Sequence, residues 1–139
     1  MIATAIDEFI HPEITIERFE SADIDPEQFN HEAHVYVGWL YVREYELAEA
    51  IGKFSSGLRR LVSKLGEEGK YHATLTLFFL LLIADRAEKG EPWQVFVQRN
   101  ADLITGSKET LSRYYSDSCL FSERARERFV LPDKLASTA

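Results

Sequence analysis

The stretch ELAEAIGKFSSGLRRLVSKLG, residues 46–66, carries the clearest structural pattern in this chain of 139 residues. Its large apolar side chains recur at alternating spacings of four and three, at Leu47, Ile51, Phe54, Leu58, Leu61 and Leu65. Because an α-helix turns once in about 3.6 residues, this spacing places all of them on one face. Gly66 is a typical residue to follow the end of a helix. The stretch therefore predicts an amphipathic helix that packs against a helical core.

Similar patterns predict helices on both sides of this one. Asp25-Pro26-Glu27-Gln28 is a typical helix start, and Asn30 offers a second cap just beyond it. Helices are expected over residues 25–44, 46–65, 70–89 and 107–115. Gly90 closes the third of them, and a further helix begins at Pro92. Since the connections between them are short, neighbouring helices should pack antiparallel. The predicted fold is an all-α, small antiparallel bundle of about four to five helices.

The chain reads as a single domain over residues 1–139, with less regular ends. Residues 1–24 are expected to form an N-terminal arm, in which Glu13–Glu17 alternates like a short strand. Residues 25–115 form the bundle. Residues 116–139 are expected to form a turn of helix capped by Ser122 and then an extended tail through Pro132.

Composition narrows the class of protein. With 16 basic and 23 acidic residues and a net charge of −7, the chain lacks the basic surface that binds nucleic acid or an anionic membrane. Its longest apolar run, residues 75–84, is about half of what a membrane-spanning helix needs. A lone cysteine, Cys119, excludes a disulfide scaffold, and the N-terminus lacks the basic region of a secretory signal. We therefore expect a cytoplasmic protein with no nucleic-acid or membrane partner.

Three of the four histidines fall on core-facing sides of the predicted helices. With an advance of about 100° per residue, His31 and His34 lie about 60° apart, in the arc that also holds Gly38. His72 shares a face with Phe79 on the helix expected over residues 70–89. All three imidazoles are therefore expected in the interior, where burial and mutual repulsion keep them neutral.

Neutral imidazoles that converge predict a metal site. His31, His34 and His72 would hold one divalent metal, whether zinc, iron, copper or nickel, with an open position for substrate. The H-x-x-H spacing is one residue short of the zincin motif, and no Glu-x-x-His is present for a ferritin-like site. His11, Asp117 and Asp133 are candidates for a further ligand, although sequence spacing does not predict their positions relative to the histidines.

The metal hypothesis implies a small organic substrate, oriented by Tyr71, Thr76 and Tyr115, and an enzyme of unknown reaction. Two alternatives stay open. One is a metal-free enzyme in which a histidine acts as general base beside Tyr71 or Tyr115. The other is a non-catalytic binding or interaction protein whose buried histidines only specify packing.

Two further features have no settled role. The helix expected over residues 70–89 is apolar nearly all round, so it is either enclosed in the bundle or forms the interface of a homodimer. Arg124, Arg126 and Arg128, with Arg113, are able to bind an acid group, although exposed residues paired with glutamates are commoner.

The chain also resembles a group of small uncharacterised bacterial proteins. The resemblance extends from about Phe29 to Asp133 and lies in three elements: H-x-x-H at residues 31–34, Y-H-x-T at 71–74 and Y-S…S-x-x-A-R at 115–126. It singles out His31, His34 and His72 as the residues to carry over. Where such proteins often have Trp after Y-H-x-T-x-T, this chain has Leu77-Phe78-Phe79, so the lining of the site is expected to differ. The resemblance implies a shared site and names no substrate.

Overall fold

The computed structural model describes residues 13–134, in which the regular secondary structure is entirely helical. The predicted all-α class is confirmed. The α-helices are α2 (Ile16–Glu20), α3 (His31–Glu44), α4 (Leu47–Lys64), α5 (Ala73–Arg86), α6 (Trp93–Arg99), α7 (Ser107–Ser112), α8 (Asp117–Leu120) and α9 (Glu123–Glu127). Three short 3₁₀ turns are η1 (Pro26–Gln28), η2 (Glu68–Lys70) and η3 (Ala101–Leu103). None of the helices in this part of the chain is both long and apolar enough to cross a membrane.

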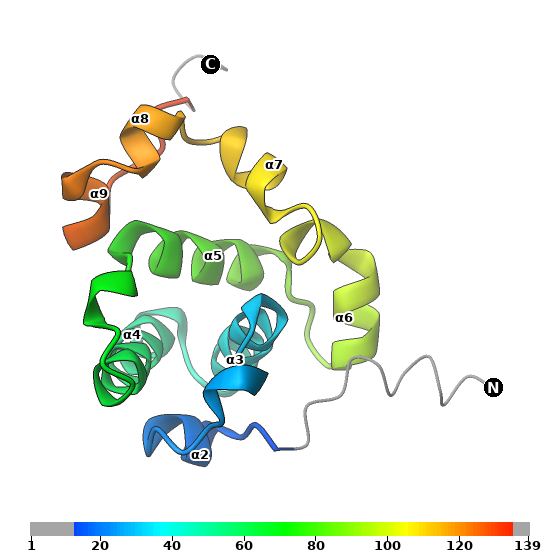
Figure 1. Cartoon of the computed structure of the whole chain (residues 1–139). Helices are drawn as coiled ribbons and strands as arrows, with labels where there is room; N and C mark the ends of the chain where they lie inside the picture. The colour runs from blue at the N-terminus through cyan, green and yellow to red at the C-terminus, as the bar shows by residue number, and fades with distance from the viewer. Residues whose placement is uncertain (1–12, 135–139) are drawn as a thin grey trace.

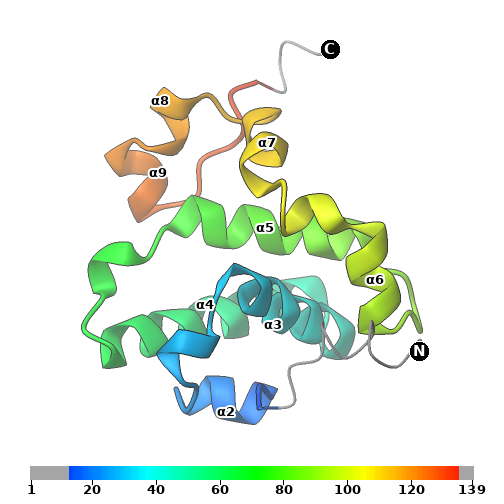
Figure 2. The same ribbon diagram turned by 45° about the vertical axis from the view of Figure 1, so that its right-hand side comes forward.

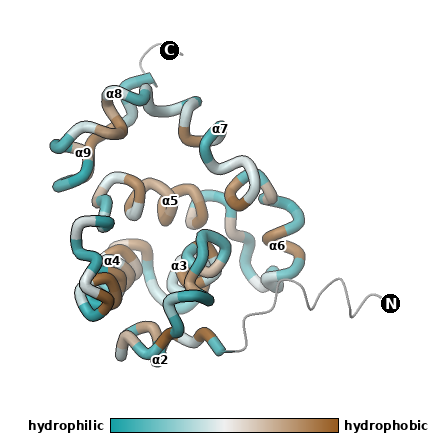
Figure 3. The backbone as a smooth tube through the Cα atoms, viewed as in Figure 1, coloured by the Kyte–Doolittle hydropathy of each residue, from teal (hydrophilic) through white to brown (hydrophobic). Residues whose placement is uncertain are grey.

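The arrangement centres on α5. Figure 1 shows α3 and α4 side by side and nearly end-on, with α5 lying across them. Helix α2 covers the opposite side of the α3–α4 pair, while α7, α8 and α9 lie beyond α5, an order that is also visible in Figure 2. Helix α5 is hydrophobic along most of its length (Figure 3) and contacts α3, α4 and α9. Its apolar surface is therefore used within the chain, and a homodimer stays a prediction.

The segment before the first long helix is part of the core. In place of the short strand expected over residues 13–17, residues 13–15 lead into α2, and the Thr15 hydroxyl accepts a hydrogen bond from the N–H of Arg18 at 3.1 Å. Phe19 is fully buried and packs directly over Gly57 of α4. Residues 13–24 therefore pack against the core through α2, and the strand expected within them is replaced by a helix. Residues 1–12, including the candidate ligand His11, lie outside the described residues.

Several helix ends agree with the sequence, among them those of α4 and the start of α6, and others differ. Asn30 caps α3 as expected, its side chain accepting from the N–H of Ala33 at 2.9 Å, but residues 26–28 form the separate turn η1.

Helix α5 begins at Ala73 rather than at about Lys70, because residues 68–70 form η2 and His72 is the capping residue. Helix α7 ends at Ser112, so Tyr115 lies beyond it. The cap at Ser122 is confirmed.

The chain after α9 is fixed to α5 by one buried threonine. Thr74 is fully buried; its hydroxyl donates to the carbonyl of Arg128 at 2.9 Å and accepts from the N–H of Val130 at 3.1 Å. The hydroxyl of Tyr115 donates to the carbonyl of Val130 at 2.6 Å. These bonds satisfy the backbone of a segment that has no regular structure of its own.

Candidate functional site

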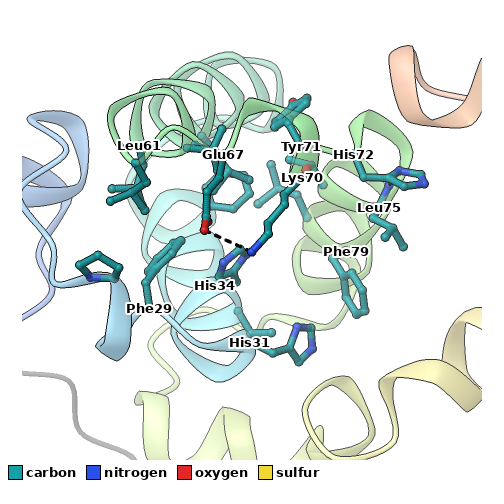
Figure 4. A pocket seen from close by; sticks show the side chains of 18 of the residues that line it. Phe29, His31, His34, Leu61, Glu67, Lys70, Tyr71, His72, Leu75 and Phe79 are labelled. Atoms are coloured by element: carbon teal, nitrogen blue, oxygen red, sulfur yellow. Dashed lines mark hydrogen bonds and ion pairs between the residues drawn. The ribbon is translucent and has the colours of Figure 1, made fainter. Parts of the chain in front are cut away.

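A chamber of about 380 Å³ lies between α3, α4 and α5, with η1 and η2 beside it (Figure 4). Pockets for small organic molecules span about 300–1,000 Å³ and have mainly apolar walls with a few polar groups. This chamber fits that description. Its walls are mostly aliphatic and aromatic side chains, and the polar or charged ones are His31, His34, Glu67, Lys70, Tyr71, His72 and Thr76.

His34 is the polar group set among the apolar walls. Helix α3 places its imidazole against the ring of Phe29, with ring centroids 4.1 Å apart. Desolvation, and then repulsion from a charged His31, lower the pKa of His34 from 6.5 to about 4. Among the described residues no hydrogen bond reaches its ring nitrogens. The chamber therefore presents a neutral imidazole whose hydrogen-bonding capacity is unused.

His31 lies at the edge of the chamber and is exposed, contrary to the expectation of an interior ring. The reason is its place as the first residue of α3, beyond the part of the helix that the core covers. Its Nε2 donates to the carbonyl of Leu103 at 2.8 Å, and its ring meets Phe79 edge-on. His31 thus joins the start of α3 to η3.

His72 caps α5. Its Nδ1 accepts a hydrogen bond from the N–H of Leu75 at 3.1 Å, as an Asp or Asn side chain would at a helix start. Its Nε2 donates to the carbonyl of Leu120 at 2.8 Å. Both ring nitrogens are occupied in the neutral tautomer, and the residue ties the start of α5 to α8.

These hydrogen bonds leave the three histidines poorly suited to hold a metal together. A metal ligand needs a free ring nitrogen, and His72 has none while His31 has only Nδ1. No group of three or more His, Cys, Asp or Glu residues among residues 13–134 could hold a metal ion. Of the carboxylates considered as further ligands, Asp133 accepts from the backbone and hydroxyl of Ser116, and Asp117 is exposed. The three rings therefore line one chamber, but their free nitrogens do not form one set of metal ligands.

The other predicted site residues divide into two groups. Tyr71 and Thr76 line the chamber, and the guanidinium of Arg59 lies 4.7 Å from the centroid of the Tyr71 ring. Tyr115 does not line it, because its ring packs on Phe78, with centroids 5.2 Å apart. The structure therefore brings Tyr71 and Thr76, but not Tyr115, to the histidines.

Two charged residues at the chamber were missed by sequence reasoning. Glu67 and Lys70 both line the chamber and are both exposed, so they lie where it meets solvent. The Lys70 ammonium is 3.2 Å from a carboxylate oxygen of Glu67, an ion pair marked in Figure 4. The useful sequence signal was their position in the short link between two helices that share an apolar core.

Comparison with known proteins adds no relative: no protein-family model, curated protein or solved structure matches this chain.

Proposed function

We propose that this protein binds a small, mainly apolar organic molecule in the chamber between α3, α4 and α5, with His34 as a neutral hydrogen-bonding group. One observation carries the proposal. An imidazole that no described residue hydrogen-bonds stands among mainly apolar walls, and desolvation lowers its pKa to about 4. A ligand that carries one hydrogen-bonding group on an apolar body matches this combination of ring and walls.

Binding is favoured over acid–base catalysis by the same ring. A general base works best when its pKa lies near the working pH, and a pKa of about 4 makes His34 a weak base near neutrality. The neutral ring nevertheless has one donor and one acceptor nitrogen at neutral pH. The hydroxyl of Thr76, on the neighbouring helix α5, offers the ligand a second neutral group at the wall.

The test uses toluene and p-cresol, which differ by one hydroxyl group. Titration of each into the protein, followed through backbone amide NMR signals, should shift residues of α3, α4 and α5 around the chamber. We expect p-cresol to bind about tenfold more tightly, the value of one hydrogen bond to a buried partner. His34→Leu should abolish this preference while keeping toluene binding, and His34→Gln should keep most of it.

Either of two results would overturn the proposal. Shifts confined to residues away from the chamber would place binding elsewhere. Equal affinity of the two probes for the unmodified protein would remove His34 as the group that recognises the ligand. Thermal unfolding of each variant, measured without ligand, shows that the fold is intact before binding is compared.

A further inference from the structure

Among the described residues that line the chamber, the full charges lie together at one place. These charges are those of Glu67 and Lys70, which lie at the solvent edge, Lys70 in η2 and Glu67 directly before it. The remaining walls offer apolar side chains and neutral polar groups such as His34 and Thr76. Because a charge buried among apolar walls without a counter-charge is strongly disfavoured, a charged group on the ligand has to sit at this edge.

Two further cations lie close to the segment that carries this edge, although the chain as a whole has a net charge of −7. The guanidinium of Arg59 lies over Tyr71, and Nη2 of Arg126 lies 3.9 Å from the position that a Cβ would take on Gly69. With Lys70, three cations therefore surround a segment whose own acids are Glu67 and Glu68.

The ion pair at the edge is easily exchanged. The side chains of Lys70 and Glu67 are 73% and 44% exposed, and the residues are three apart in one turn. Exposed pairs of this kind contribute little to stability, because water screens the charges and both side chains lose freedom. Lys70 is thus free to turn from Glu67 to an anion bound at the chamber.

We infer that the ligand is an amphipathic organic anion, with its apolar body between α3, α4 and α5 and its acid group at Lys70. This inference rests on the proposed function and assigns the chemical class of the ligand. The acid group takes the place of Glu67 as the partner of Lys70. Arg59 and Arg126 add long-range attraction without entering the chamber.

The test compares octanoate, octanol and octylamine, which share one apolar chain and differ in the charge of the head group. Isothermal titration at neutral pH, below the concentration at which any of them forms micelles, should rank octanoate tightest and octylamine weakest. Lys70→Gln should weaken octanoate by about fivefold and leave octanol unchanged. Glu67→Gln should strengthen octanoate, because it removes the competing carboxylate.

Lys108→Gln is the matched control, since Lys108 is an exposed lysine of α7 that does not line the chamber. It changes the net charge equally and should leave the three affinities as they are. Equal binding of octanoate and octanol, or tightest binding of octylamine, overturns the inference and leaves the proposed function standing. The inference is also overturned if octanoate, octanol and octylamine all fail to bind while p-cresol still binds. If p-cresol and toluene also fail to bind, the proposed function itself is wrong.

Discussion

The imidazole of His34 is stacked on the ring of Phe29, with a centroid separation of 4.1 Å and an angle of 30° between the planes. Burial lowers the pKa of this histidine to about 4 in the folded chain, against 6.5 for the free group. Above pH 6.5 the ring is neutral in both states. Between pH 6.5 and 4 the unfolded chain binds a proton and the folded chain does not, so stability falls with falling pH, by at most about 3 kcal/mol.

The free energy of unfolding, measured in urea from pH 7.5 to 4, checks this. The difference in the free energy of unfolding between the unmodified protein and His34→Gln reports the contribution of His34, because the carboxylates titrate in both proteins. We expect that difference to shift steadily against the unmodified protein as the pH falls from 6.5. A constant difference across this range would show that His34 is as easily protonated in the folded chain as in water.

His72 should act on stability through its cap. His72→Ala loses the bond to the Leu75 N–H and the bond to the Leu120 carbonyl, at a total cost of about 2 kcal/mol. His72→Asn can still cap the helix and should recover about half of that loss. Urea midpoints measure both. Equal loss in the two variants would contradict the role of Nδ1 as the capping atom.

The contact between α2 and α4 depends on the absence of a side chain at Gly57. A Cβ there would collide with the ring of Phe19, which is fully buried. Gly57→Ala should therefore cost about 1–3 kcal/mol of stability through overpacking. Gly52→Ala is the matched control on the same helix, where a Cβ meets nothing within 4 Å, and it should gain about 0.5–1 kcal/mol. Thermal unfolding separates the two, and equal gains would mean that Phe19 does not pack there.

The prediction of one divalent metal is tested by elemental analysis of protein purified without a histidine tag. Because His72 uses both ring nitrogens, we expect far less than one equivalent of zinc, iron, copper or nickel. About one metal per chain, lost in both His34→Ala and His72→Ala, would show that the metal displaces the bonds to Leu75 and Leu120. That result would replace the proposal for an apolar ligand with a metal centre.

Helical periodicity predicted much of the fold and the core of the site. The spacing of apolar residues located α4, and the face of α3 that carries His34 was expected in the interior, where the structure has it. The same reasoning predicted that Thr76 shares a face with His72, and both residues line the chamber. These features depend on local geometry, which the sequence expresses directly.

The other features depend on contacts between distant residues. The bonds of His31 to Leu103 and of His72 to Leu120 span 72 and 48 residues, and no spacing rule indicates them. The start of α5 was placed too early because histidine is not among the usual capping residues. Tyr115 was expected in a helix over residues 107–115, but α7 ends at Ser112 and the Tyr115 ring packs on Phe78 instead of lining the chamber.

The most direct test of the central claim fills the chamber. Val62 of α4 lines the chamber and is half-buried, whereas its neighbour Ser63 is exposed and does not line it. Calorimetric titration with p-cresol should show binding to the unmodified protein and to Ser63→Phe, and none to Val62→Phe. A cooperative thermal unfolding transition in each of the three proteins shows that all of them are folded. Unchanged binding by Val62→Phe would contradict the claim that the ligand occupies the space between α3, α4 and α5.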